Sequence, residues 1–107
     1  MESLISRLEQ EGQEDRVVVM TFSEFGRRLQ ENASLGTDHG AAAPVFFAGP
    51  NFQSGIVGKQ PSLTDLDGGD LKFYTDFRSL YATLLEKWFG TTSKPILDES
   101  YPTIDLI

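Results

Sequence analysis

Two short polar segments carry side chains that could hold a metal ion and an anion. Asp38 and His39 are adjacent, and His39 is the only histidine among the 107 residues. A carboxylate and an imidazole are ordinary zinc ligands, but zinc takes three or four ligands, so Glu24 or Asp76 would have to join this pair through the fold. The alternative for His39 is an exposed or hydrogen-bonded side chain that holds no metal.

Ser23 and Arg27 have the chemistry of an anion-binding site. The apolar run over residues 17–22 ends at Ser23, and a helix beginning there would direct backbone N–H groups at a phosphate or sulfate. Arg27, about one turn further along, would add a bidentate contact. The alternative is a helix-capping serine, an acid in the first turn and solvated arginines.

The elements that would position these residues alternate between helix and strand. The pattern predicts helices over residues 3–11, 23–32 and 75–89, and buried strands over residues 16–22 and 44–48. This order predicts an α/β fold with a few-stranded, mostly parallel sheet and flanking helices. Because ligands bind beyond the carboxyl ends of parallel strands, we expect both polar segments at one edge of that sheet.

The remaining segments are expected to be structural. Residues 33–43 are predicted to form a loop, and residues 49–71 a long loop with a small hairpin near Ile56 and Val57. The acidic segment 65–70 lacks the glycine and ligand positions of a calcium loop, so we interpret it as a solvated turn. One apolar stripe of the last helix is predicted to be core: Phe77, Tyr81, Leu84 and Trp88.

The composition limits the fold and the partners. With 107 residues, of which 39% are hydrophobic, the chain fits a single domain over residues 1–107 with an irregular tail at 91–107. A net charge of −7 argues against nucleic acid and anionic membranes. There is no cysteine, no apolar run of membrane-spanning length and no export signal at Met1.

Three segments, taken together and in this order, resemble a known family. They are VVVMTFSEFGRR at 17–28, GTDHG at 36–40 and DLKFYTDFRSLY at 70–81. They are similar to the C-terminal part of a bacterial sulfatase-like family, domain-of-unknown-function family 1501 of the alkaline phosphatase superfamily. The resemblance implies a large α/β sandwich, of which this chain would be roughly the last quarter.

The resemblance also implies roles for the polar residues. Ser23 and Glu24 look like an acidic metal-ligand corner, and His39 looks like a further ligand, with Asp38 beside it. The implied cofactor is a divalent metal, namely zinc, manganese or calcium. The chain departs from the superfamily at Ser23 and Glu24, where an Asp-His pair is usual. The resembled family is typically exported by the twin-arginine route.

Two functions follow as expectations. The first is the C-terminal portion of a metal-dependent phosphate or sulfate ester hydrolase, inactive alone because the nucleophile of such enzymes lies upstream. The second is a non-enzymatic, self-associating structural module. Since two strands make a poor parallel sheet, the expected partner is either a second copy in a homo-oligomer or the N-terminal part of a parent domain. Metal bound at Asp38 and His39 would favour the hydrolase.

Overall fold

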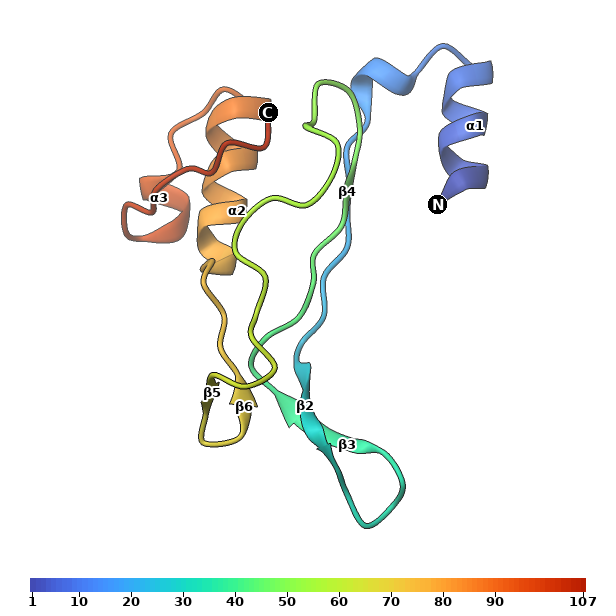
Figure 1. Ribbon diagram of the computed structural model, residues 1–107. Coiled ribbons are helices and arrows are strands. Elements are labelled where there is room, and N and C mark those ends of the chain that lie inside the picture. Colours follow the sequence, from blue (N-terminus) through green and yellow to red (C-terminus); the bar gives the residue numbers. More distant parts are fainter.

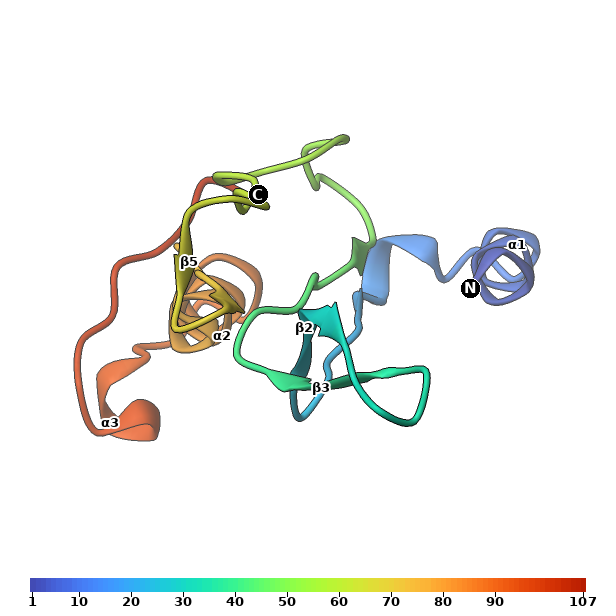
Figure 2. The same ribbon diagram turned by 60° about the horizontal axis from the view of Figure 1, so that its bottom comes forward.

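The chain forms an elongated molecule with its strands between two groups of helices. The computed structural model describes all of residues 1–107 and has a radius of gyration of 16.6 Å, whereas a compact domain of this length has about 13 Å. Figures 1 and 2 both place α1 on one side of the strands and α2 and α3 on the other.

The helices and strands are short. The helical elements are α1 (Glu2–Gln10), the 3₁₀ turn η1 (Glu14–Arg16), α2 (Phe77–Thr83), the π-helix η2 (Leu84–Trp88) and α3 (Lys94–Leu97). The strands are β1 (Val19–Met20), β2 (Gly26–Glu31), β3 (Thr37–Gly40), β4 (Phe47–Ala48), β5 (Leu66–Asp67) and β6 (Asp70–Leu71). No helix is long and apolar enough to cross a membrane.

The strands pair in three separate antiparallel sheets, each of two strands: β1 with β4, β2 with β3, and β5 with β6. The mixed helix and strand content is confirmed, but the expected mostly parallel sheet is wrong. Parallel neighbours need a crossover of a dozen or more residues, whereas β2–β3 and β5–β6 are joined by short turns. The β2–β3 hairpin also reverses the chain between β1 and β4, so those two strands run antiparallel.

The predicted helix over residues 23–32 is absent and this segment contains β2, and the predicted loop over residues 33–43 contains β3. Gly26 explains the difference, since a Cβ there would overlap the backbone carbonyl oxygen of Ala42. This backbone contact joins two extended segments that are distant in sequence, and a helix would break it. Ser23 caps no helix, because its hydroxyl donates to the carbonyl of Phe25 at 2.6 Å.

The β5–β6 hairpin lies within the acidic segment that was interpreted as a solvated turn. Its turn is formed by Gly68 and Gly69, with φ of 57° and 85°. Two consecutive positive φ values are what a two-residue hairpin turn requires, and glycine accepts them without strain. The predicted hairpin near Ile56 and Val57 is wrong, since no strand forms there and Ile56 is 89% exposed.

The C-terminal helices contain most of the buried side chains. Leu80, Ala82 and Leu106 form the apolar core, next to the buried polar residues Ser79, Thr83 and Ser93. The prediction that Phe77 and Tyr81 belong to the core is wrong, because these rings are 60% and 37% exposed. The tail over residues 91–107 runs back along α2 and covers a neighbouring face of this helix. The face that carries Phe77 and Tyr81 therefore stays exposed.

Candidate functional site

The β2–β3 hairpin brings two of the predicted site residues together. Arg27 and His39 lie directly opposite each other across the two strands. Residues opposite each other in an antiparallel pair have Cβ atoms about 5 Å apart on the same face. Between this pair and the Glu31–Thr37 pair, β2 has three residues and β3 has only one. The two extra residues of β2 form a bulge, at which the register shifts. Arg27 and His39 therefore share one face of the hairpin.

Phe25 holds the imidazole of His39 in place. The two rings are stacked, with centroids 3.5 Å apart and an angle of 12° between their planes. The guanidinium carbon of Arg27 lies 5.3 Å from the centre of the same phenyl ring, and Arg27 Nη1 donates to the carbonyl of Thr37 at 2.8 Å. Stacking covers a face of the imidazole and leaves its nitrogens at the edge of the ring, where no other residue hydrogen-bonds to them.

Asp38 does not share this face. Adjacent residues of a strand point to opposite sides of the sheet, so Asp38 and His39 are directed apart. The carboxylate of Asp38 accepts a hydrogen bond from Asn32 Nδ2 at 3.0 Å. Asn32 Oδ1 in turn accepts from the backbone N–H groups of Ser34 and Gly36 at 3.0 and 3.1 Å. Asp38 therefore stabilises the turn between β2 and β3.

Ser23 and Glu24 precede the hairpin and are both exposed. The hydroxyl of Ser23 donates its hydrogen bond to the carbonyl of Phe25, and Glu24 forms no ion pair. No group of three His, Asp or Glu side chains comes together anywhere in the chain. Since a zinc site has at least three protein ligands, residues 24, 38, 39 and 76 do not by themselves form one.

Arg28 and Asp70, which the sequence analysis did not single out, hold the β5–β6 hairpin against the candidate site. The guanidinium of Arg28 donates to the carbonyl of Gly68, and Asp70 Oδ2 accepts from the backbone N–H of Ala41 at 3.0 Å. The other oxygen of Asp70 is buried without a partner, and a Cβ on Gly40 would lie 2.6 Å from it. Two glycines between Asp67 and Asp70 were the signal for this hairpin.

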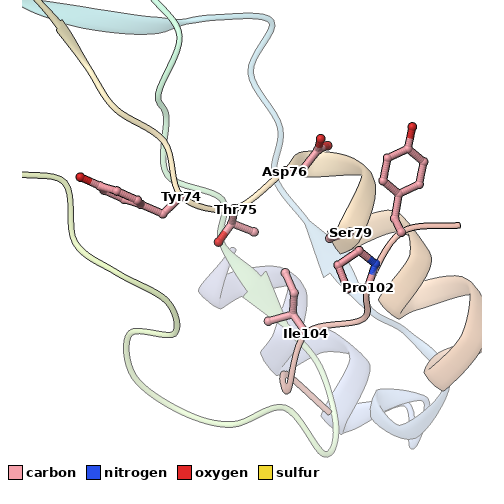
Figure 3. A pocket seen from close by; sticks show the side chains of 7 residues that line it. Tyr74, Thr75, Asp76, Ser79, Pro102 and Ile104 are labelled. Carbon is pink, nitrogen blue, oxygen red and sulfur yellow. The ribbon is translucent and has the colours of Figure 1, made fainter. Parts of the chain in front are cut away.

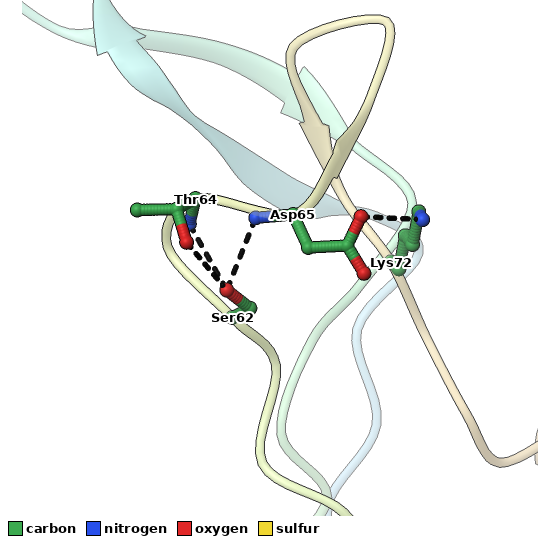
Figure 4. A network of polar contacts seen from close by, with 4 residues as sticks. All are labelled: Ser62, Thr64, Asp65 and Lys72. Carbon is green, nitrogen blue, oxygen red and sulfur yellow. Dashed lines mark hydrogen bonds and ion pairs between the residues drawn. The ribbon is translucent and has the colours of Figure 1, made fainter.

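Figure 4 shows the polar contacts that shape the base of β5–β6. The hydroxyl oxygen of Ser62 accepts from the backbone N–H groups of Thr64 and Asp65 at 3.1 and 3.0 Å. Lys72 Nζ donates to Asp65 at 2.7 Å, and this hydrogen bond lowers the pKa of Asp65 and raises the pKa of Lys72. Both side chains are solvent-exposed, so this ion pair adds little to stability.

A shallow cleft of about 350 Å³ lies at the start of α2 (Figure 3). Its charged group, Asp76, accepts from the backbone N–H, Nε and Nη2 of Arg78 at 2.9, 3.0 and 2.7 Å. The side-chain hydrogen bonds from Arg78 lower the pKa of Asp76 to about 2. Arg78 also lies over the ring of Tyr101, 4.6 Å from its centre. Asp76 is therefore a helix cap, and the cleft offers no nucleophile paired with a base.

The comparisons with known proteins confirm the resemblance to domain-of-unknown-function family 1501. Residues 1–97 match the family described as "Protein of unknown function (DUF1501)". Neither a curated protein nor a solved structure matches the chain. Because the match extends over most of the sequence, including both strands of the Arg27–His39 hairpin, the chain belongs to the DUF1501 family.

Proposed function

We propose that the chain is the C-terminal portion of a metal-dependent phosphate or sulfate ester hydrolase, and that it contributes the contacts to the anionic ester. The observation that supports this is the pairing of Arg27 with His39 on one face of the β2–β3 hairpin. A guanidinium has five N–H donors, and Arg27 uses one of them for the carbonyl of Thr37. The other donors and the edge of the imidazole can bind the oxygens of one anion.

The proposed metal would be bound only when this chain is part of a longer protein that supplies further ligands. Zinc, manganese or calcium would need ligands beyond residues 1–107, because no set of three is assembled within them. When bound, such a metal polarises the ester oxygens. The residues of this chain would orient the substrate, with Arg27 binding its charge and Phe25 fixing the plane of His39. The chain alone is expected to show no turnover.

The test is an NMR titration of the His39 ring protons with inorganic phosphate and sulfate. We expect saturable shifts in the native chain and at least a tenfold weaker response in Arg27→Gln. Arg16→Gln is the matched control, since Arg16 lies in η1 and pairs with Gln13. Equal responses in both variants would refute an anion site at Arg27. Hydrolysis of p-nitrophenyl phosphate by the isolated chain, lost in His39→Ala, would refute the expected inactivity.

The amount of exposed surface favours a second function, that of a self-associating module. The chain exposes 7888 Å² of accessible surface, compared with about 5,900 Å² for a compact monomer of this mass. Many large apolar side chains contribute to the excess, among them Phe22 at 81% and Phe46 at 61% exposed. A surface of this kind is typical of a protein that buries it against a partner.

A further inference from the structure

We infer that the free edge of β1 is a self-association site, at which β1 pairs antiparallel with β1 of a second copy of this chain. The pairing would join two β1–β4 ribbons into one four-stranded sheet across a twofold axis. It gives the self-associating function a defined surface and is independent of the anion site. The following observations support it.

The hydrogen-bonding direction of β1 leaves one row of backbone groups free. The N–H of Thr21 donates to the carbonyl of Phe46 at 2.9 Å, so Thr21 is turned toward the β4 side. Since alternate residues of an antiparallel pair face opposite edges, the N–H and C=O of Met20 point away from β4. No other strand pairs with β1. Met20 therefore presents a donor and an acceptor to an incoming strand.

The side chains around this edge are apolar and uncharged. Residues 17–20 are all half-buried, on both faces of the strand, which is typical of a strand inside a larger sheet. Neither residues 17–22 nor residues 44–49 include a charged residue, although the chain as a whole carries a net charge of −7. Depletion of charge marks the centre of an interface. Two copies can therefore meet here without bringing their acidic residues together.

The chain as a whole has enough exposed surface for a stable dimer. Summed over its length, the surface in excess of a compact monomer is roughly 2,000 Å² per chain. A standard interface buries only about 800 Å² on each partner. A two-stranded ribbon is also marginally stable by itself, and three or more strands are needed for independent stability. Pairing through β1 would supply both the burial and the additional strands, and an identical edge on each copy closes the dimer.

The decisive experiment compares two adjacent amides of the native 107-residue chain. Sedimentation velocity over a range of concentrations should show a monomer–dimer equilibrium. Hydrogen exchange under the same conditions should show Thr21 protected throughout, because its partner is Phe46 in the same chain. Met20 should become protected only at concentrations where the dimer forms. A folded monomer at high concentration, or a dimer in which Met20 exchanges freely, would overturn the inference.

Two proline substitutions provide a matched pair. Met20→Pro removes an N–H from the free edge of β1, and Val45→Pro removes one from the outer side of the segment that leads into β4, while the bonds between the two strands are kept. We expect Met20→Pro to weaken dimerisation at least tenfold and Val45→Pro to leave it unchanged. Met20→Lys, which adds a positive charge to the paired edge of each copy, should weaken the dimer at low salt, and added salt should restore dimerisation. The opposite result for the two prolines would overturn the assignment to β1.

Discussion

The C-terminal helical region over residues 76–107 and the strand region over residues 17–71 bury very different fractions of their side chains. Six of the seven buried residues lie in the helical region. In the strand region only Gly26 is buried. The helical region covers α2 with its own tail, whereas the strand region consists of three separate sheets of two strands each.

Buried polar groups show the same contrast. In the helical region Thr83, which is 0% exposed, donates to the carbonyl of Ser79 at 2.6 Å and accepts from the N–H of Ile104 at 2.9 Å. In the strand region Asp70 Oδ1 is buried with no partner. A folded region that is complete satisfies its buried polar atoms. The strand region, which contains the candidate site, therefore leaves a buried polar atom unsatisfied where the helical region does not, as the proposed self-association of the strand region predicts.

Gly26→Ala should have the largest effect, because the new Cβ would meet backbone in the tightest contact of the strand region. Moving the carbonyl of Ala42 away should separate the strands at that end and destabilise the hairpin by about 3 kcal/mol. The nuclear Overhauser contacts between Phe25 and His39 report the loss. Gly36→Ala is the control, since its Cβ would have only Asn32 Oδ1 near it, at 3.9 Å. Intact ring contacts in Gly26→Ala would contradict the prediction.

Thr83→Val should have the next largest effect and tests whether the helical region is self-contained. The substitution keeps the shape and leaves the N–H of Ile104 without its acceptor, which costs about 2 kcal/mol when buried. Exchange of the Ile104 amide should become faster, while the amides of β2 and β3 are unaffected. Thr91→Val, at an exposed position, should change stability by less than about 0.5 kcal/mol. Faster exchange in β2 would show that the two regions unfold together.

Local signals in the sequence were sufficient for α1 and α2, whereas α3 lies in the tail that was predicted to be irregular. Gly12, with φ of 64°, lies just beyond the end of α1, and Asp76 caps α2 by accepting from the N–H of Arg78. Capping and helix-ending preferences depend on residues within one turn, so they can be read from the chain alone. The buried face of α2 was predicted wrongly because the tail over residues 91–107 determines which face is covered. The spacing of apolar residues within the helix does not show where the tail will pack.

The strands depended on contacts between distant residues. Ser23 and Glu24 are residue types that favour the start of a helix. The segment that follows them is nevertheless extended, because the backbone of Gly26 packs closely against that of Ala42. Antiparallel pairing then put Asp38 and His39 on opposite faces, so the two could not act as the pair that their adjacency suggested. Arg27 and His39 were both predicted as site residues, although their contact across the hairpin was not visible in their spacing.

Acid should weaken the helical region through Asp76, which has a pKa of about 2. The carboxyl has a pKa of about 4 when unfolded, so between these values the unfolded state binds more protons and stability falls as pH falls. The contribution is complete above about pH 4 and is lost as pH falls through 2. Thermal midpoints of the native chain and Asp76→Asn should therefore converge between pH 5 and pH 2. Asp105→Asn, which removes an exposed carboxylate outside any ion pair, should follow the native chain.

The smallest effect is expected from Lys72→Met in the strand region. The ion pair with Asp65 is exposed, so physiological salt screens it, and holding two side chains in one geometry costs entropy. The turn before β5 depends instead on the Ser62 hydroxyl, which accepts from two backbone N–H groups. Lys72→Met should therefore leave the thermal midpoint unchanged at physiological salt and lower it slightly at low salt, whereas Ser62→Ala should lower it at both. Loss of amide protection in β5 and β6 in Lys72→Met would show that a surface charge holds this hairpin in place of its backbone turn.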